Sequence, residues 1–333
     1  MTRKLHLSIM AAALACSALA QSANEHWVAT WAASMLETAV PAPAPANAAP
    51  VAVIMISLNE GHNMEAVCRN LAGWAQGVFL VDSYSQDDTV DIALHHGGHV
   101  VQRRFRGFGD QWNFALEHLP ITAPWTMKLD PDERLSDELK ANLLTAMHEN
   151  KADGFSLARR LCFMDQPLPV RQTLVRVWRT GNCRFTDIAV NEHPLVTGSI
   201  AHVKGEMDHY DSPDLDHWLE KQNRYTTAEA LIAYHQSPLA DTPRLLGTAF
   251  QRRMWLKKHF HRLPGRFFLF FLYGWLWQGA WRAGWVGYAW ARLRSDVMRL
   301  HDYKRREMEI TGRLPVKRCY GPGQPDARVR QFD

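Results

Sequence analysis

A chain of 333 residues is long enough for one large α/β domain with an appendage or for two modest domains. A hydrophobic share of 47% supports a substantial core and excludes global disorder. The formal charge is only +4, but basic residues greatly outnumber acidic ones between Arg244 and Arg318, which indicates an anionic partner there, a membrane surface or nucleic acid. The five cysteines include no Cys-x-x-Cys pair, so neither a zinc site nor a disulfide framework is indicated.

The first 50 residues differ in character from the chain behind them. Arg3 and Lys4 precede the apolar run "LHLSIMAAALACSALA", the layout of a secretory signal, and "PAPAPANAAP" at 41–50 is typical of a semi-rigid linker. "HWVATWAAS" resembles the opening strand of secreted SGNH-type esterases, but no Gly-Asp-Ser nucleophile block follows. We interpret residues 1–50 as a foreign leader that packs poorly against the rest; a disordered or membrane-touching tail is the alternative.

From Val51 the pattern alternates between apolar runs and amphipathic segments. The runs predict strands at "VAVIMIS", "GVFLVDS", "HVVQRRF" and "WTMKLD". Helices are predicted from Asn59 to Trp74 and at "DDTVDIALHHG", "GDQWNFALEHL" and "SDELKANLLTAMHEN", the last capped by Ser136. Such alternation predicts a parallel sheet with right-handed crossovers, in which ligands bind at the carboxyl ends of the strands.

Beyond Lys151 the alternation weakens. Short strands are predicted at "GFSLARRLCFM", "TLVRVWRT" and "GSIAHVKGEMDHY", which indicates an irregular or antiparallel extension of the sheet. "LDHWLEKQNRYTTAEALIAYH" has the pattern of an amphipathic helix.

The segment 266–294 is crowded with Phe, Trp and Tyr and flanked by Lys and Arg. Its apolar stretch from Phe267 ends at Arg282, short of the roughly 20 residues that a spanning helix needs. We therefore expect residues 255–294 to form an interfacial helix or shallow re-entrant hairpin that contacts a membrane surface and not nucleic acid; a buried core helix is the alternative. The predicted organisation is a leader and linker (1–50), an α/β domain (51–240), a basic aromatic helical region (241–310) and a flexible tail (311–333).

Three predicted strand ends carry polar residues that should meet at one edge of the sheet. They are Asn59 and Glu60, Asp82 and Ser83, and Asp130, Asp132 and Glu133. Alternation places Asp130 and Asp132 on the same side, with Pro131 fixing the turn. Two carboxylates so held suit Mg²⁺ or Mn²⁺, which could bridge the oxygens of a diphosphate, although Asp-x-Asp also occurs in turns for local reasons.

Three blocks together resemble the family-2 glycosyltransferases of the GT-A fold, in particular their lipopolysaccharide-core and cell-envelope branch. The blocks are "SLNEGHNMEAVCRNLAGWAQGVFLVDSYSQDDTVDIA", "RFRGFGDQWNFAL" and "LDPDERLSDEL", and the similarity extends over about Val51 to Glu309. The resemblance implies a mostly parallel sheet flanked by helices, with a Rossmann-like nucleotide-binding half. It also implies inverting transfer of a sugar from a nucleotide-sugar donor to a lipid-linked or lipopolysaccharide acceptor.

The resemblance further implies roles for individual residues. The nucleoside of the donor would be bound by Asn59, Glu60 and Asp82. The donor pocket would be lined by Gln111 and Asn113, unless these two only pack their helix. The diphosphate would be met by Arg103, Arg104 and Arg106. The metal motif Asp-x-Asp would be formed by Asp130 and Asp132, with Asp132 as the direct ligand. His209 would be a third metal ligand or a core residue. Glu192 would be the general base or part of a surface turn.

Three positions depart from the family pattern. Asn191 replaces the usual His before Glu192, Tyr84 stands where a Gly is expected, and Pro131 replaces a small residue.

Two other functions compete with sugar transfer. A nucleotidyltransferase would need a Gly-rich loop bearing Lys or Arg after the first strand, and "SLNEGHNM" offers none. A non-catalytic membrane-binding protein with a GT-A-like domain would not need the intact acidic set. Since nucleotide sugars are cytosolic, we expect a peripheral or monotopic enzyme at the cytoplasmic face of the inner membrane, an expectation with which the signal-like leader conflicts.

Overall fold

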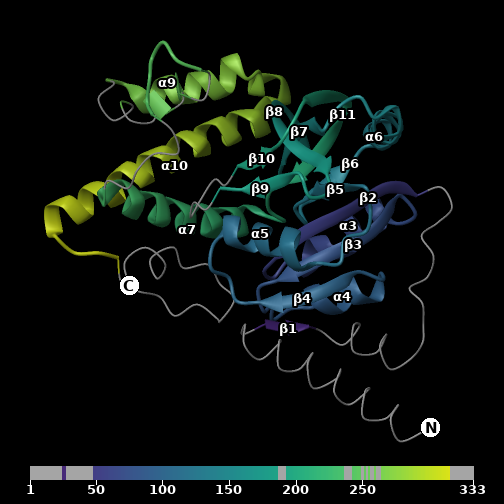
Figure 1. Ribbon diagram of the computed structural model, residues 1–333. Helices are drawn as coiled ribbons and strands as arrows, with labels where there is room; N and C mark the ends of the chain where they lie inside the picture. Colours follow the sequence, from purple (N-terminus) through teal and green to yellow (C-terminus); the bar gives the residue numbers. More distant parts are fainter. Residues whose placement is uncertain are drawn as a thin grey trace, which may run out of the picture. The chain divides into compact units, whose positions relative to one another are not determined.

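The computed structural model describes residues 48–186, 193–235, 242–248 and 264–315, the backbone of 25–27, and the single positions 251, 252, 254, 255 and 259. The chain divides into two compact units, one containing 48–156 and 175–203 and the other 157–174 and 204–315. Among the described residues one sheet holds nine strands in the order β1-β4-β3-β2-β5-β8-β7-β11-β6, as Figure 1 shows in part.

Four neighbouring strands form the parallel centre of this sheet. They are β2 (Ala49–Ser57), β3 (Ala75–Asp82), β4 (His99–Arg103) and β5 (Trp125–Lys128). The helices that connect or follow them are α3 (Gly61–Leu71), α4 (Thr89–His95), α5 (Phe108–His118) and α6 (Asp137–Glu149). The capping of α6 is confirmed, because the Ser136 hydroxyl accepts the Leu139 N–H at 3.2 Å.

Both faces of the parallel centre are buried, which explains the continuous apolar runs. Ala52 and Ile54 of β2 pack with Trp112 of α5 in one core cluster. Val53 and Met55, which alternate with them, are also 0% exposed. The predicted α/β class of the GT-A type, with a mostly parallel centre and flanking helices, is confirmed.

The remaining strands extend the sheet beyond β5. They are β6 (Glu133–Leu135), β7 (Gly154–Phe163), β8 (Gln166–Arg179) and β11 (Ile200–Tyr210). The last residues of β8 run antiparallel to β5, with Trp125 opposite Arg179, so the predicted extension is confirmed. The short strands β9 (Cys183–Phe185) and β10 (Pro194–Val196) pair with each other in a second sheet.

One part of the N-terminal segment pairs with the sheet, although residues 1–50 were expected to pack poorly against the rest of the chain. Glu25–Trp27 forms β1 and pairs antiparallel with β4 at the edge of the sheet, with Glu25 opposite Arg103. The open edge of β4 offers unpaired N–H and C=O groups that a short extended segment can satisfy. The first central strand also begins at Ala49, two residues before the predicted boundary. The apolar run at 5–20 and most of the linker lie outside the described residues.

The second unit is largely helical. Its helices are α7 (Leu215–Tyr234), α9 (Arg266–Leu272), the π-helical η2 (Tyr273–Trp277), the 3₁₀-helical η3 (Ala280–Ala283) and α10 (Gly284–Thr311). α10 packs against α7 and α9, and the Lys304 ammonium donates to the Asn223 side chain at 2.6 Å. None of the helices in the described part of the chain combines the length and apolarity needed to cross a bilayer.

Candidate active site

The loops after β2 and β3 are joined by hydrogen bonds into one edge of the first unit. The Asn59 N–H donates to the Ser85 hydroxyl and the Gln86 N–H donates to Asn59 Oδ1, both at 2.8 Å. Asn59 (φ 55°) and Tyr84 (φ 62°) both adopt the left-handed conformation, so Tyr84 occupies a backbone geometry that suits glycine. The Glu60 carboxylate lies at this edge, with 24% of its side chain exposed.

Asp82 lies beneath this edge and is fully buried. Its carboxylate accepts hydrogen bonds from the Ser57 hydroxyl (2.8 Å), the Ser85 N–H (2.8 Å) and hydroxyl (2.5 Å), and the Gln102 amide (3.0 Å). In this structure Asp82 therefore orders the loop after β3.

Gln111 and Asn113 pack α5 against its neighbours. Gln111 is fully buried and accepts from Arg103 at 2.8 Å, and Arg103 also bonds to Asp110 at 2.5 Å. The Asn113 amide exchanges two hydrogen bonds with the backbone of Phe185, at 3.0 and 2.8 Å. The sequence left open whether Gln111 and Asn113 line the donor pocket or pack their helix. The described contacts of both side chains are packing contacts of α5.

The two other predicted diphosphate-binding arginines have a different environment. Arg104 and Arg106 are exposed, unlike the buried Arg103. Of the three, these two are therefore accessible to an anion at the end of β4.

The turn after β5 is held by a buried arginine of β8. Arg176, 4% exposed, bonds to Asp130 at 2.9 Å and to the fully buried Glu133. Glu133 in turn accepts the Asp130 N–H at 3.0 Å. Burial acts to lower the pKa of Arg176, but the two carboxylates outweigh it and raise the pKa above its ordinary value. Asp130 therefore forms an ion pair with the Arg176 guanidinium.

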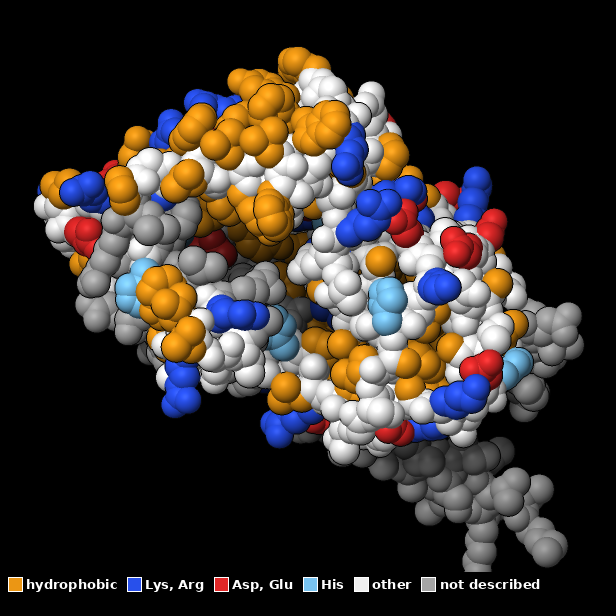
Figure 2. Space-filling model, turned by 90° about the horizontal axis from the view of Figure 1, so that it is seen from above, with side chains coloured by type: hydrophobic (Ala, Val, Ile, Leu, Met, Phe, Trp, Pro, Cys, Tyr) orange, Lys and Arg blue, Asp and Glu red, His pale blue; other side chains and the backbone are white. Residues whose placement is uncertain are grey.

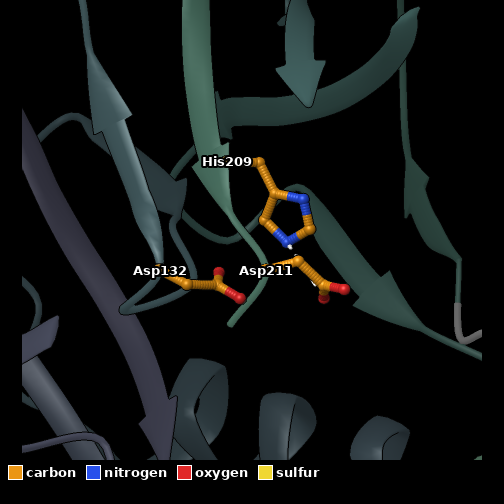
Figure 3. A group of neighbouring side chains, drawn as sticks. All are labelled: Asp132, His209 and Asp211. Atoms are coloured by element: carbon orange, nitrogen blue, oxygen red, sulfur yellow. Dashed lines mark ion pairs between the residues drawn. The ribbon is translucent and has the colours of Figure 1, made fainter. Parts of the chain in front are cut away.

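Asp132 belongs to another group of side chains, with His209 and Asp211 (Figure 3). One potential ligand atom from each residue lies within 4.8 Å of the others, and His209 Nε2 is 4.0 Å from Asp211 Oδ1. Asp132 directly precedes β6, which neighbours β11, the strand that ends just before Asp211. Two carboxylates and an imidazole are a donor set that suits a divalent cation.

The predicted metal ligands are thus only partly brought together. Asp132 and His209 lie in one group, Asp130 does not belong to it, and Asp211 was not predicted. The sequence carried a signal for Asp211, because residues 209 and 211 in "DHYDS" alternate onto one side of an extended segment. Lys221 lies 3.0 Å from Asp211 Oδ1 and donates to the Asp211 carbonyl at 2.9 Å, which orients this end of the strand.

Glu192, the predicted general base, lies outside the described residues. The positions on either side of 187–192 are described, and they lie together. The His193 N–H donates to the Thr186 hydroxyl at 3.0 Å, and the Thr186 N–H donates to the His193 carbonyl at 3.2 Å.

Comparison with known proteins gives matches at the level of sequence. Residues 52–204 match the model of the glycosyl transferase family 2. An uncharacterized glycosyltransferase of Rickettsia prowazekii is 24% identical over 196 residues, which cover 54% of this chain and 66% of that protein, just under two thirds of its length. A second uncharacterized glycosyltransferase, from Rickettsia bellii, is 33% identical over 90 residues, 27% of this chain and 30% of that protein.

Solved structures also align with this chain. Residues 1–349 of TarS from S. aureus, in complex with UDP-GlcNAc, are 14% identical with a TM-score of 0.41, covering 79% of this chain and 92% of that one. Glucosyl-3-phosphoglycerate synthase from Mycobacterium tuberculosis, in complex with Mn²⁺, UDP and glucosyl-3-phosphoglycerate, is 14% identical with a TM-score of 0.38, covering 58% of this chain and 82% of that one.

Proposed function

Residues 52–204 are a glycosyltransferase family 2 domain, and from this premise we propose that the protein transfers a sugar from a nucleotide-sugar donor to an acceptor hydroxyl, with inversion and with a divalent cation. The single observation that carries the proposal is the match of residues 52–204 to the glycosyl transferase family 2 model. In a sheet of this kind, ligands bind where the parallel strands end.

The cation, Mg²⁺ or Mn²⁺, would be held by Asp132, His209 and Asp211. When bound, it supplies positive charge opposite the departing diphosphate. Arg176 acts behind these ligands, since its ion pairs with Asp130 and Glu133 fix the turn that carries Asp132. Asp130 thus supports the ligand geometry in this proposal instead of binding the ion.

The donor would lie along the edge formed by Asn59 and Glu60, with Arg104 and Arg106 available to its phosphates. Asp82 contributes by holding the loop after β3 in shape. The acceptor oxygen attacks the anomeric carbon as the bond from that carbon to the diphosphate oxygen breaks, and the hydroxyl proton passes to the Glu192 carboxylate. Glu192 is proposed from the sequence resemblance alone.

We propose a lipid-linked or lipopolysaccharide-type acceptor, used at the cytoplasmic face of the inner membrane, as part of cell-envelope glycan synthesis. The nucleotidyltransferase alternative fits less well. The loop after β2 has its first glycine at Gly61, and the N–H of that residue donates to Asp87 at 2.9 Å instead of facing a phosphate.

Calorimetric titration of UDP, GDP, CDP and ADP, with and without Mn²⁺, tests the proposal. At least one nucleotide should bind in a Mn²⁺-dependent manner, and Asp132→Asn should weaken that binding at least about tenfold because a direct ligand is lost. Asp216→Asn, at an exposed position on α7, should bind like the wild type. Glu192→Gln should keep donor binding and lose about 10²-fold or more in transfer. Unchanged Mn²⁺-dependent binding in Asp132→Asn would contradict the metal assignment.

A further inference from the structure

α9, η2, η3 and the first turns of α10 expose an unusual number of large apolar side chains. We call this surface the aromatic face; its members are Phe268 (63% exposed), Leu269 (54%), Tyr273 (49%), Leu276 (53%), Trp277 (83%), Trp281 (50%), Trp285 (69%) and Tyr288 (46%). Single exposed apolar residues are ordinary on soluble proteins, but a contiguous group of this size marks a surface that another body covers.

Helical spacing accounts for parts of the aromatic face. Leu269, Tyr273 and Trp277 recur every fourth residue along α9 and η2, and Trp285 and Tyr288 are three residues apart in α10. Figure 2 shows hydrophobic side chains gathered over this part of the molecule, with Lys and Arg side chains at their margin.

The opposite side of the same helices has its own packed core. Ala280, Trp290 and Ala291 are at most 6% exposed and belong to one buried cluster. Gly274 allows close contact, because a Cβ there would lie 3.3 Å from the Trp290 ring. At Gly287 a Cβ would lie 1.8 Å from the Ala280 carbonyl oxygen, so a side chain is not tolerated. The helices are therefore well packed without the aromatic face, and its exposure is not a packing defect.

The segment that carries this surface is basic. Between Thr242 and Ser295 the sequence holds ten Lys and Arg residues and no Asp or Glu. Two of these residues pair with acidic side chains of α10, Arg266 with Asp302 at 2.7 Å and Arg292 with Asp296 at 3.2 Å. Arg282 is exposed and lies 5.3 Å from the centre of the Trp281 ring. A second copy of the same surface would bring two such basic segments together, so self-association through this face is disfavoured.

We propose that the aromatic face docks onto an anionic lipid bilayer, with Trp277, Trp281 and Trp285 in the headgroup region and Arg282 against lipid phosphates. Trp and Tyr prefer this zone, and a surface that also carries Leu269 and Leu276 gains from contact with acyl chains, which nucleic acid does not offer. Anionic headgroups supply the charge that the segment lacks. This docking goes beyond sugar transfer and does not depend on it.

Co-sedimentation of the full chain with vesicles tests the proposal. Binding to phosphatidylglycerol-containing vesicles should exceed binding to pure phosphatidylcholine and should fall as salt rises. The double variant Trp277→Ala/Trp285→Ala should lower the partition coefficient at least about tenfold, because two large apolar contacts are lost. Arg282→Gln should lower it about fivefold, and only on anionic vesicles.

Tyr303→Ala provides the matched control, because Tyr303 is an aromatic residue of α10 with 58% exposure that lies outside the aromatic face. It should bind vesicles like the wild type, and all variants should keep the wild-type circular dichroism spectrum. Glycerol phosphate should not compete with the vesicles. Three results would each overturn the proposal: equal binding by the double variant, absence of vesicle binding by the wild type, or a dimer or oligonucleotide complex that the double variant abolishes.

Discussion

The parallel strands β2 to β5 and the helices α9 to α10 are both rich in large apolar side chains, but they place them differently. Val53, Met55 and Leu80 in the strands are fully buried, whereas Trp277 and Trp285 in the helices are 83% and 69% exposed. The apolar side chains of the strands are removed from water when the chain folds, and this burial stabilises the fold. The described residues leave Trp277 and Trp285 largely uncovered, which is the observation behind the proposed contact with a lipid surface.

The two regions also treat charge differently. In the first unit the buried charged groups around the β5 turn are matched with each other, as Arg176 is with Glu133 and Asp130. The segment 242–295, which carries the aromatic face, has ten basic residues and no acidic one of its own, and two of its arginines, Arg266 and Arg292, pair with carboxylates of α10. The excess of positive charge in this segment favours a partner of opposite sign.

Paired tryptophan variants test this comparison most directly. Trp112→Ala should lower the free energy of unfolding by about 3–5 kcal/mol, because the ring is fully buried, stacks with Phe185 and lies under the Lys128 ammonium at 4.4 Å. Trp277→Ala should change it by no more than about 0.5 kcal/mol. Urea unfolding followed by circular dichroism measures both. A large loss in Trp277→Ala would mean that the aromatic face stabilises the fold, and the contrast between the regions would fail.

Removing the buried guanidinium tests the matched charges of the first region. Arg176→Met should cost about 3–5 kcal/mol, because Glu133 and Asp130 are left as uncompensated carboxylates. Adding Glu133→Gln should recover part of this loss. Arg171→Gln, which removes an exposed ion pair with Glu206, should cost about 1 kcal/mol or less. Equal losses for the two arginines would show that burial of the pair has no energetic weight.

A smaller effect is expected at Asp87, which caps α3 from the neighbouring loop. Burial acts to raise its pKa, but hydrogen bonds from the Thr89 hydroxyl and from the N–H groups of Gly61 and Thr89 outweigh it and lower the pKa below the ordinary 3.8. The stabilisation is therefore complete above pH 4 and is lost as the pH falls through the lowered value. Solvent screening leaves about 0.5–1 kcal/mol for Asp87→Asn at neutral pH.

The pH dependence distinguishes this cap from a neutral hydrogen bond. The difference between wild type and Asp87→Asn in urea unfolding should shrink steadily below pH 4. Asp88→Asn, at an adjacent exposed position with no side-chain capping bond, should show no such trend. A difference that stays constant down to the acid limit would rule out the charged cap.

Much of the framework could be predicted from local sequence. The apolar run "VAVIMIS" needed burial on both faces and became the central strand β2. The Ser136 cap and the amphipathic pattern at 215–235 likewise predicted α6 and α7 closely, because these signals act within a few residues.

The candidate site was harder to predict from the sequence because it depends on residues that lie far apart along the chain. Arg176 lies 46 residues from Asp130, and no local pattern indicates that the two form an ion pair. The sequence predicted Asp130 as a metal ligand beside Asp132, whereas the structure gives Asp130 an ion pair with Arg176 at 2.9 Å. Asp82 carried a strand-end signal typical of a binding residue, and only the structure shows that four donors already surround its carboxylate.

The buried ion pair between Arg176 and Glu133 also constrains how the protein can change during evolution. Losing either side chain leaves the other charge in the interior without this partner, so the two positions should be replaced nearly simultaneously. We expect close homologues to retain both residues or neither, and an alignment that shows free single replacements would argue against this interdependence.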